Sequence, residues 1–301
     1  MITGRDDERD LERLSWSDFF RSAFREANQT VYQGRVARGP FYTEINQALG
    51  GINEEIAKVS PELTPECFFP ASYRSREVSA TINKVYRAAL WRDYENDSRN
   101  FRVKREHSIS QAIKPKAKET LAQTIPAGLL DQPDYRCMST GRDCVTTSFM
   151  MIMDAITNGT ADDTDIHRII QWEYRDDVIH DEEYIKLLQS RVFQQRFGKT
   201  VQAASFVGAD FAMIAKLAER LREGNPDRKI FGVVNLLSDT TYMTRVNGIW
   251  HSAVLLNVTD DYVTIHEPTV NGYGEELRIP KDKFLFRWSQ GLLRGHLIIA
   301  E

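Results

Sequence analysis

The spacing of apolar residues along the chain changes between residues 222 and 229. Up to residue 222, apolar side chains recur every three or four positions, which is the period of a helix with one buried face. From residue 229 onward they form short continuous or alternating runs bounded by turn-forming residues, a pattern typical of strands. The sequence therefore predicts an α+β fold in which helices come first and an antiparallel sheet follows.

The first hundred residues predict a helical N-terminal region. Apolar stripes at helical spacing occupy residues 10–32, 41–60 and 75–97. The pair Gly50-Gly51 interrupts the second stripe, so residues 41–60 are expected to form two short helices. The region carries no recognisable catalytic motif, and we expect it to bind a partner or to cover a cleft of the region that follows.

Residues 101–125 differ in composition from their neighbours. They contain few aromatic residues and a cluster of lysines and arginines, which predicts a connector or a surface arm. The cluster lacks the interleaved aromatic residues on which single-stranded nucleic acid stacks, so a solvated face is the preferred interpretation. The expected organisation is a helical domain at 1–100, a connector at 101–125 and a second domain at 126–301.

The second domain is predicted to begin with helices and to end with strands. Val145–Thr157 has apolar residues on one helical face, and Asn158-Gly159 is a typical C-terminal stop. Further helices are expected at residues 164–173, 181–197 and 210–222, and strands at residues 229–237, 251–258, 262–268, 275–279 and 295–300.

Cys144 lies at the start of the helix expected at 145–157. A thiol becomes a good nucleophile only when it loses its proton, and both the positive end of a helix and an adjacent histidine favour that loss. Asp143 is a residue type favoured as an N-cap, and the polar stretch STGRD before the helix suits an accessible sulfur. A free cysteine taken alone more often packs as a small apolar residue, so a nucleophilic Cys144 requires a partner base.

His251, at the start of strand 251–258, and Glu267, near the end of strand 262–268, are the candidates for a base and its orienting carboxylate. With a three-residue loop between the strands, the expected cross-strand pairs are Asn257–Val263, Leu255–Ile265 and Ala253–Glu267. His251 and Glu267 are then diagonal neighbours on one face of the hairpin, within reach of each other. A register shift of one residue would place Glu267 on the opposite face.

Three stretches resemble one bacterial family. DCVTTSFMMIMDAI around Cys144, WHSAVLLNVTDDYVTIHEPTVNG around His251, and FLFRWSQGLLRGHLIIA with its Trp288-x-x-Gly291 pattern are similar to the papain-like peptidase domains of bacteriocin-exporting ABC transporters and their free-standing relatives. The resemblance covers residues 138–301. It implies a papain-like fold, a helical lobe with an antiparallel sheet, in which Cys144 is the nucleophile, His251 the base and Glu267 the acidic third residue. Better-known members of the family cut leader peptides after a double glycine.

Three positions depart from the family pattern. Val145 stands where a glycine often follows the cysteine, and Glu267 replaces the usual aspartate. Met138 occupies the position of a glutamine that usually donates to the oxyanion, and losing one such donor lowers rates by about 10²–10³-fold. The side chains considered as replacement donors, beside the backbone N–H of Cys144, are Gln132, Ser139 and Thr140.

Composition and charge limit the partners and the cellular location that we expect for this chain. The chain has 301 residues, 42% of them hydrophobic, and a net charge of −4, so it has no global basic field to attract nucleic acid. The longest apolar runs fall short of the roughly 18 residues that a membrane helix needs, and the charged N-terminus has no apolar signal core. Cys67, Cys137 and Cys144 fit reduced thiols rather than a disulfide framework or zinc site. A cytoplasmic location is expected, with secretion by a non-standard route left open.

These features predict a cysteine-dependent hydrolase, and among hydrolases a peptidase, that acts on a peptide or protein and needs no metal or organic cofactor. Trp250, beside the expected base, is a candidate wall of the substrate cleft or a core residue. Two alternatives keep the same fold. One is a catalytically inactive module that binds peptides, which the missing glutamine favours, and the other is an acyltransferase or transglutaminase that uses the same three residues.

Overall fold

The structure, a computed structural model, describes residues 40–59, 68–70, 122–137, 144–161, 181–237, 250–268, 274–290 and 293–301. The helices are α3 (Pro40–Val59), α6 (Cys144–Thr157), α8 (Asp181–Leu188), α9 (Arg191–Phe197), α10 (Phe211–Gly224) and α11 (Lys281–Gln290). The strands are β1 (Phe68–Pro70), β2 (Val201–Phe206), β3 (Lys229–Leu237), β4 (Trp250–Val258), β5 (Tyr262–His266), β6 (Leu277–Pro280) and β7 (Arg294–Ala300).

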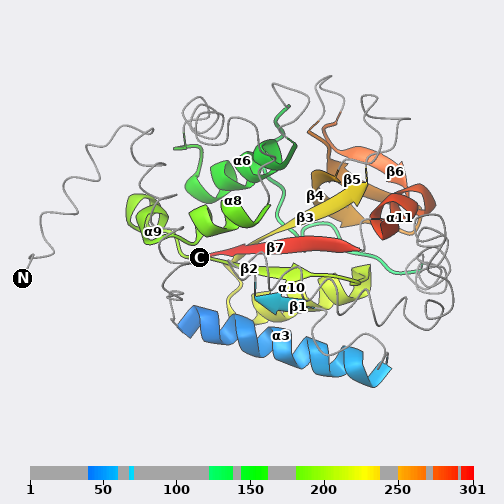
Figure 1. The fold of residues 1–301 in the computed structure, drawn as a ribbon, viewed down its shortest axis with the longest axis horizontal. Helices are drawn as coiled ribbons and strands as arrows, with labels where there is room; N and C mark the ends of the chain where they lie inside the picture. The colour runs from blue at the N-terminus through cyan, green and yellow to red at the C-terminus, as the bar shows by residue number, and fades with distance from the viewer. Residues whose placement is uncertain are drawn as a thin grey trace, which may run out of the picture.

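The described strands form a seven-stranded sheet in the order β1-β2-β7-β3-β4-β5-β6 (Figure 1). Each neighbouring pair is antiparallel. The last strand, β7, lies between β2 and β3, so the end of the chain occupies the middle of the sheet. The predicted α+β class, with helices and an antiparallel sheet, is confirmed.

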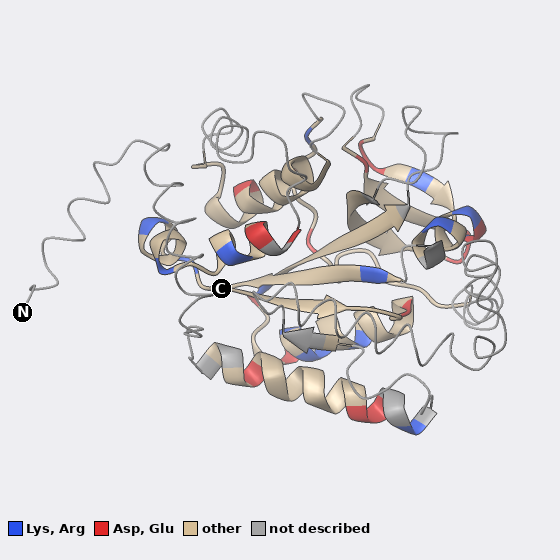
Figure 2. Cartoon of the chain, viewed as in Figure 1, with Lys and Arg blue, Asp and Glu red and all other residues tan. Residues whose placement is uncertain are grey.

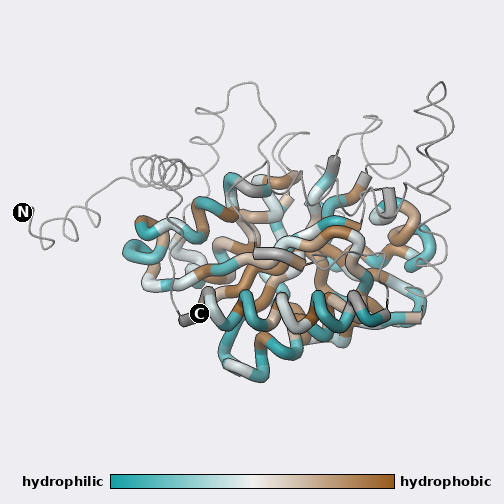
Figure 3. The backbone as a smooth tube through the Cα atoms, turned by 60° about the horizontal axis from the view of Figure 1, so that its bottom comes forward, coloured by the Kyte–Doolittle hydropathy of each residue, from teal (hydrophilic) through white to brown (hydrophobic). Residues whose placement is uncertain are grey.

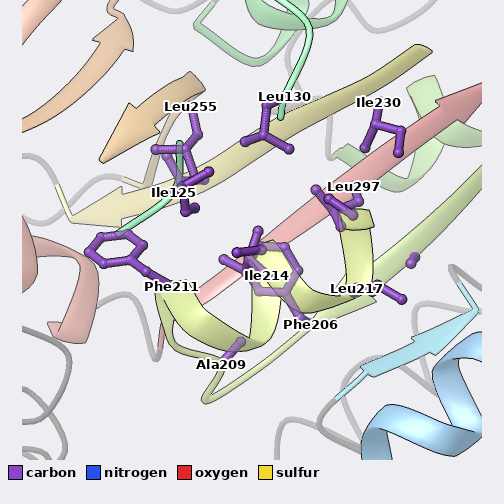
Figure 4. Close-up of a cluster of buried hydrophobic side chains, with 14 of the residues drawn as sticks. Ile125, Leu130, Phe206, Ala209, Phe211, Ile214, Leu217, Ile230, Leu255 and Leu297 are labelled. Carbon is purple, nitrogen blue, oxygen red and sulfur yellow. The ribbon is translucent and has the colours of Figure 1, made fainter. Parts of the chain in front are cut away.

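Helices cover both faces of this sheet. On β4, Ala253 and Leu255 join a core with α3, α10 and α11, which we call the α10 core, whereas Val254 and Leu256 join a core with α6, α8 and α9, the α6 core. Figure 1 shows α6 and α8 on one side of β7 and α10 and α3 on the other. Figure 4 shows the α10 core, where side chains such as Phe206 and Leu217 lie between α10 and the strands. Because both faces are buried, the central strands read as continuous apolar runs. Figure 3 colours the described backbone by hydropathy and shows hydrophobic stretches, in brown, between hydrophilic ones, in teal.

Helix α3 is integral to this architecture. Its apolar stripe enters the α10 core through Phe41, Ile45, Leu49 and Ile52. Arg228, almost fully buried, binds Glu44 of α3 with both terminal nitrogens, and Glu55 pairs with Lys216 and Arg220 of α10. Acidic residues of α3 are visible in Figure 2.

Helix α3 and strand β1 correct the predicted organisation. A helical domain at 1–100, separate from 126–301, does not describe residues 40–59 and 68–70, because α3 shares the core of the second domain and β1 pairs with β2 in its sheet. From the connector predicted at 101–125, Ile125 pairs with Val258 of β4. The rest of 1–121 lies outside the described residues.

Two helix predictions differ from the structure. The break expected at Gly50-Gly51 is wrong, because α3 runs continuously through both glycines. Burial of its stripe outweighs a helix-propensity cost of about 1 kcal/mol per glycine. The helix expected at 181–197 is two helices, α8 and α9, because Ser190 caps α9 by accepting a hydrogen bond from the backbone N–H of Phe193 at 3.0 Å.

The other predictions for the second domain are mostly confirmed. The strands expected from residue 229 onward are present as β3 to β7, and the helices expected at 145–157 and 210–222 are α6 and α10. Three elements were not predicted, namely β1, β2 and α11. The helices expected at 10–32, 75–97 and 164–173 lie outside the described residues.

The described helices include none whose length and apolar character would let it span a lipid bilayer.

Candidate functional site

Helix α6 places Cys144 at its first residue. Cys144 is half-buried, and the rest of the helix packs tightly, with Phe149, Met151 and Ile152 almost inaccessible. At the other end Asn158 and Gly159 adopt positive φ angles of 54° and 74°, which confirms the predicted stop. The Cys144 sulfur therefore lies where unpaired N–H groups give a helix its positive end. The proposed cap, Asp143, lies outside the described residues.

The β4–β5 hairpin brings His251 and Glu267 to one face by a route that differs from the prediction. The predicted pair Asn257–Val263 is wrong, because Asn257 pairs with Thr264 and Val258 with Val263. A bulge between Leu255 and Asn257 then restores the predicted pair Leu255–Ile265. The bulge explains why Leu255 and Val258, three residues apart, both face the α10 core.

His251 contacts both of the other candidate residues. Its Nε2 atom is hydrogen-bonded to Oε1 of Glu267, and both side chains are more than nine-tenths buried. The same ring is hydrogen-bonded to the Cys144 side chain. Since Glu267 occupies Nε2, Nδ1 is the ring nitrogen left for the thiol. The structure thus brings Cys144, His251 and Glu267 together in series.

The electrostatics of this group favour a charged imidazole. Burial opposes protonation of His251. The negative charges of Glu267 and of an ionised Cys144, together with the hydrogen bonds that the ring donates to them, nevertheless raise the pKa of His251 to about 10. At neutral pH the imidazole is therefore an imidazolium that can balance a thiolate. A thiolate–imidazolium pair is the reactive form of a cysteine nucleophile.

Glu267 is held by its backbone. Its N–H donates to the carbonyl of Gly274 at 2.9 Å, and Tyr135 donates its hydroxyl to the Glu267 carbonyl at 3.2 Å. A Cβ atom on Gly274 would lie only 1.8 Å from that carbonyl oxygen, so this close approach requires glycine. The contacts with Gly274 and Tyr135 thus hold the backbone that carries the carboxylate.

His266, the neighbour of Glu267, points to the other face of β5 and is buried. Its Nε2 lies 2.9 Å from the Pro133 carbonyl, and its Nδ1 accepts from the Glu276 N–H at 3.2 Å. A carbonyl needs a donor and an N–H needs an acceptor, so both contacts select the neutral Nε2–H tautomer. The ring centroid of Tyr135 is 5.5 Å from that of His266, so both contacts anchor residues 133–135 beside the end of β5.

Of the other candidate residues, the structure describes the side chain of Gln132 alone. Gln132 is exposed, and its amide donates to Oε1 of Glu276 at 2.8 Å, so it is engaged elsewhere. Ser139 and Thr140, like Met138, lie outside the described residues. Trp250 is the first residue of β4, and its backbone pairs with Leu237. Helix α3, the described helix of the N-terminal region, packs against β1, β2 and α10 rather than near β4, so it does not cover the site.

Sequence reasoning missed the residues that support the three. Tyr135 was not singled out, because its contact with Glu267 joins segments more than a hundred residues apart. Gly274 was not singled out, because its close approach to the Glu267 carbonyl is a tertiary contact that no periodicity predicts.

Among the described residues, no group of three or more His, Cys, Asp or Glu side chains is arranged to hold a metal ion. Comparison of the sequence with known protein families and with curated proteins finds no match.

Proposed function

We propose that this chain is a cysteine-dependent hydrolase of papain-like type that acts on a peptide or protein. The observation that supports the proposal is the contact of one buried imidazole, His251, with a thiol at a helix start on one side and a carboxylate on the other. A papain-like fold also requires this arrangement, in which a helix that bears the cysteine packs against an antiparallel sheet that carries the base. The order Cys144, His251, Glu267 along the chain agrees with the family resemblance of residues 138–301.

The proposed reaction proceeds in two steps. His251 takes the thiol proton, and the Cys144 thiolate attacks the carbonyl carbon of the scissile amide. As the C–N bond breaks, the imidazolium gives its proton to the leaving amine, which leaves a thioester on Cys144. Water then attacks the thioester, with His251 as the base, and releases the acid and the free thiol. Glu267 keeps Nδ1 of His251 directed at the sulfur throughout.

The backbone N–H of Cys144 is the donor that we assign to the developing oxyanion, because N–H groups at a helix start have no partner within the helix. Gln132 does not complete this donor pair while it binds Glu276. That observation favours one second candidate function, a module that binds peptides without cutting them. A nucleophilic thiol at Cys144 suits a reducing compartment, and we propose the cytoplasm.

The test has two parts. First, the rate at which Cys144 is alkylated is measured against pH in the wild type and in His251→Ala. Digestion of the labelled protein and mass spectrometry of the fragment that contains Cys144 separate its rate from those of the other cysteines. A midpoint below pH 7 that moves toward the ordinary thiol value of about 8.5 in the variant supports the pair, and equal midpoints overturn it. Second, a peptide library that includes double-glycine sequences is incubated with the wild type and with Cys144→Ala, with and without an added amine.

The products identify the activity. Hydrolysed peptides that depend on Cys144 support the hydrolase, whereas amine adducts in place of acids identify acyl transfer. Binding of library peptides without any product, in a protein whose thiol is activated, supports the non-cutting module and overturns the hydrolase.

A further inference from the structure

A second buried polar group lies next to the candidate site and takes no part in the proposed reaction. Asp181, the first residue of α8, accepts hydrogen bonds from Asn235 at 2.6 Å and His296 at 3.1 Å on Oδ2, and from Ser252 at 3.2 Å on Oδ1. The Asn235 amide also donates to the Ser252 hydroxyl at 2.9 Å. Ser205 lies 2.8 Å from the other ring nitrogen of His296. All five residues are at most 7% exposed.

The group holds a buried negative charge. Burial alone would raise the pKa of Asp181, but the hydrogen bond and charge of His296, the charge of Arg294 and the Asn235 amide together lower it to about 2. A carboxylate can only accept, so Asn235, Ser252 and His296 must all present donors to it. The carboxylate therefore fixes the orientation of three side chains on β3, β4 and β7 at once.

Ser205, His296 and Asp181 also form a serine–histidine–carboxylate series, but their burial excludes a substrate. Their exposed fractions are 2%, 0% and 4%. A hydrolytic role therefore requires opening of the central strands β2 and β7. A role inside the fold is the one that the surroundings of this group support.

The group connects the two elements that carry the proposed catalytic pair. Ser252 directly follows His251 on β4, and Ser148 lies one helical turn after Cys144 on α6. The Ser148 hydroxyl donates to the Ser252 carbonyl at 3.1 Å, which joins the two elements. Helix α8 contacts both, because Asp181 binds Ser252 and the Tyr184 hydroxyl donates to Thr146 of α6 at 2.6 Å.

We propose that Asp181 is a positioning residue that, through Ser252 and Asn235, sets β4 against α6 and so holds the His251 imidazole at the Cys144 sulfur. The inference rests on the proposed function. Loss of the carboxylate leaves the donors of Asn235, Ser252 and His296 without an acceptor, so these side chains must reorient. Movement of β4 relative to α6 then weakens the contact between sulfur and imidazole, and the thiol reverts toward its ordinary acidity.

The experiment uses the full chain. It measures the alkylation midpoint of Cys144, which is the pH at which the alkylation rate of this cysteine is half-maximal, and thermal unfolding is measured in parallel. Asp181→Asn keeps the shape of the side chain and removes its charge, whereas Ser252→Ala removes one hydroxyl and keeps the carbonyl that Ser148 binds. The control is Asp210→Ala, which removes the N-cap of α10, where Asp210 accepts from the Met213 N–H at 2.9 Å. Helix α10 packs on the face of the sheet opposite α6. Loss of its cap therefore lowers the stability of the fold without changing the contact between α6 and β4.

We expect Asp181→Asn and Ser252→Ala to raise the midpoint by about one pH unit, which is a tenfold change in thiolate fraction. Asp210→Ala should lower the melting temperature and leave the midpoint unchanged. If Asp181→Asn does not fold, Ser252→Ala decides. If His251→Ala raises the midpoint and a folded Asp181→Asn or Ser252→Ala does not, the positioning role is overturned and the proposed function stands. If His251→Ala leaves the midpoint unchanged, the catalytic pair itself is overturned.

Discussion

His251 and Glu267 are joined through Nε2 and Oε1 in a site where both side chains are more than nine-tenths buried. The pairing has two consequences for the imidazole. It leaves Nδ1 for the Cys144 thiol, and it stabilises the charged form of the ring against the cost of burial. The carboxylate therefore controls both the direction and the acidity of the proposed base.

Glu267→Gln removes the charge and keeps the shape of the side chain. We expect the pKa of His251 to fall from about 10 toward the ordinary histidine value, because the negative charge of Glu267 supports protonation. The alkaline limit of hydrolysis then moves to lower pH, because the imidazolium must protonate the leaving amine. The rate of hydrolysis should fall by at least about tenfold. The upper bound is the roughly 10⁴-fold loss seen when a serine-type triad loses its carboxylate. The check is a pH series of alkylation and of kcat/KM.

Glu276→Gln is the matched control for that series, since Glu276 binds Gln132 at an exposed position. It should keep the wild-type alkaline limit. An unchanged limit in Glu267→Gln would contradict the role given to the carboxylate.

His266 predicts an acid-sensitive stability. Burial lowers the pKa of His266, although the Pro133 carbonyl and the carboxylates of Glu275, Glu276 and Asp134 oppose the shift. Below about pH 6.5 the unfolded chain takes up a proton that the folded chain does not, so the stability from neutral His266 is present above that pH. It is lost as the pH falls through the lowered folded pKa. Urea unfolding at pH 7.5, 6.5 and 5.5 measures this loss.

His266→Gln provides the comparison, because it removes the titrating ring from the same position. The variant should be less stable at pH 7.5 and lose less further stability on acidification than the wild type. Parallel pH dependences in the two proteins would show that another group titrates.

Much of the fold was predictable because each segment's pattern agreed with its final environment. The helical stripe of 145–157 and the apolar run of 229–237 appear as α6 and β3. β2 escaped prediction because Val201–Phe206 is short, rich in alanine and buried along its whole length, so it shows no alternation. The continuous α3 escaped because tertiary burial of its stripe overrides the local signal of two glycines.

The candidate site was predictable only where the chemistry lies on regular elements. The helical period places Cys144 at a helix start, and the strand period places His251 and Glu267 on one face. The predicted loop of the hairpin was off by one residue. Thr259 closes a tighter turn by accepting from the Tyr262 N–H at 3.0 Å, and the bulge before Asn257 compensates. Asp181 gave no such signal, because its partners come from three strands that are separate in sequence.

The α10 core predicts that the second domain needs part of the N-terminal region. Burying each of Phe41, Ile45, Leu49 and Ile52 contributes about 1.5–3 kcal/mol, which together is comparable to the whole stability of a typical domain, about 5–15 kcal/mol. A chain that starts at residue 122 should therefore fail to unfold cooperatively. Leu49→Ala in the full chain should cost about 2–5 kcal/mol. A cooperative thermal transition of the shortened chain, equal to that of the full chain, would contradict this prediction.

Gly274 offers the sharpest test of how its contact with the Glu267 backbone supports the site. A methyl group there would meet the Glu267 carbonyl at 1.8 Å, so Gly274→Ala must separate the two residues and disrupt the 2.9 Å hydrogen bond from the Glu267 N–H. We expect a higher alkylation midpoint for Cys144 and a lower melting temperature. Gly50→Ala is the matched control, because nothing lies within 4 Å of that position in α3 and the change should stabilise the helix by about 0.5–1 kcal/mol. A wild-type midpoint in Gly274→Ala would mean that the carboxylate keeps its place without this contact. The backbone support described for Glu267 would then have no role in activating the thiol.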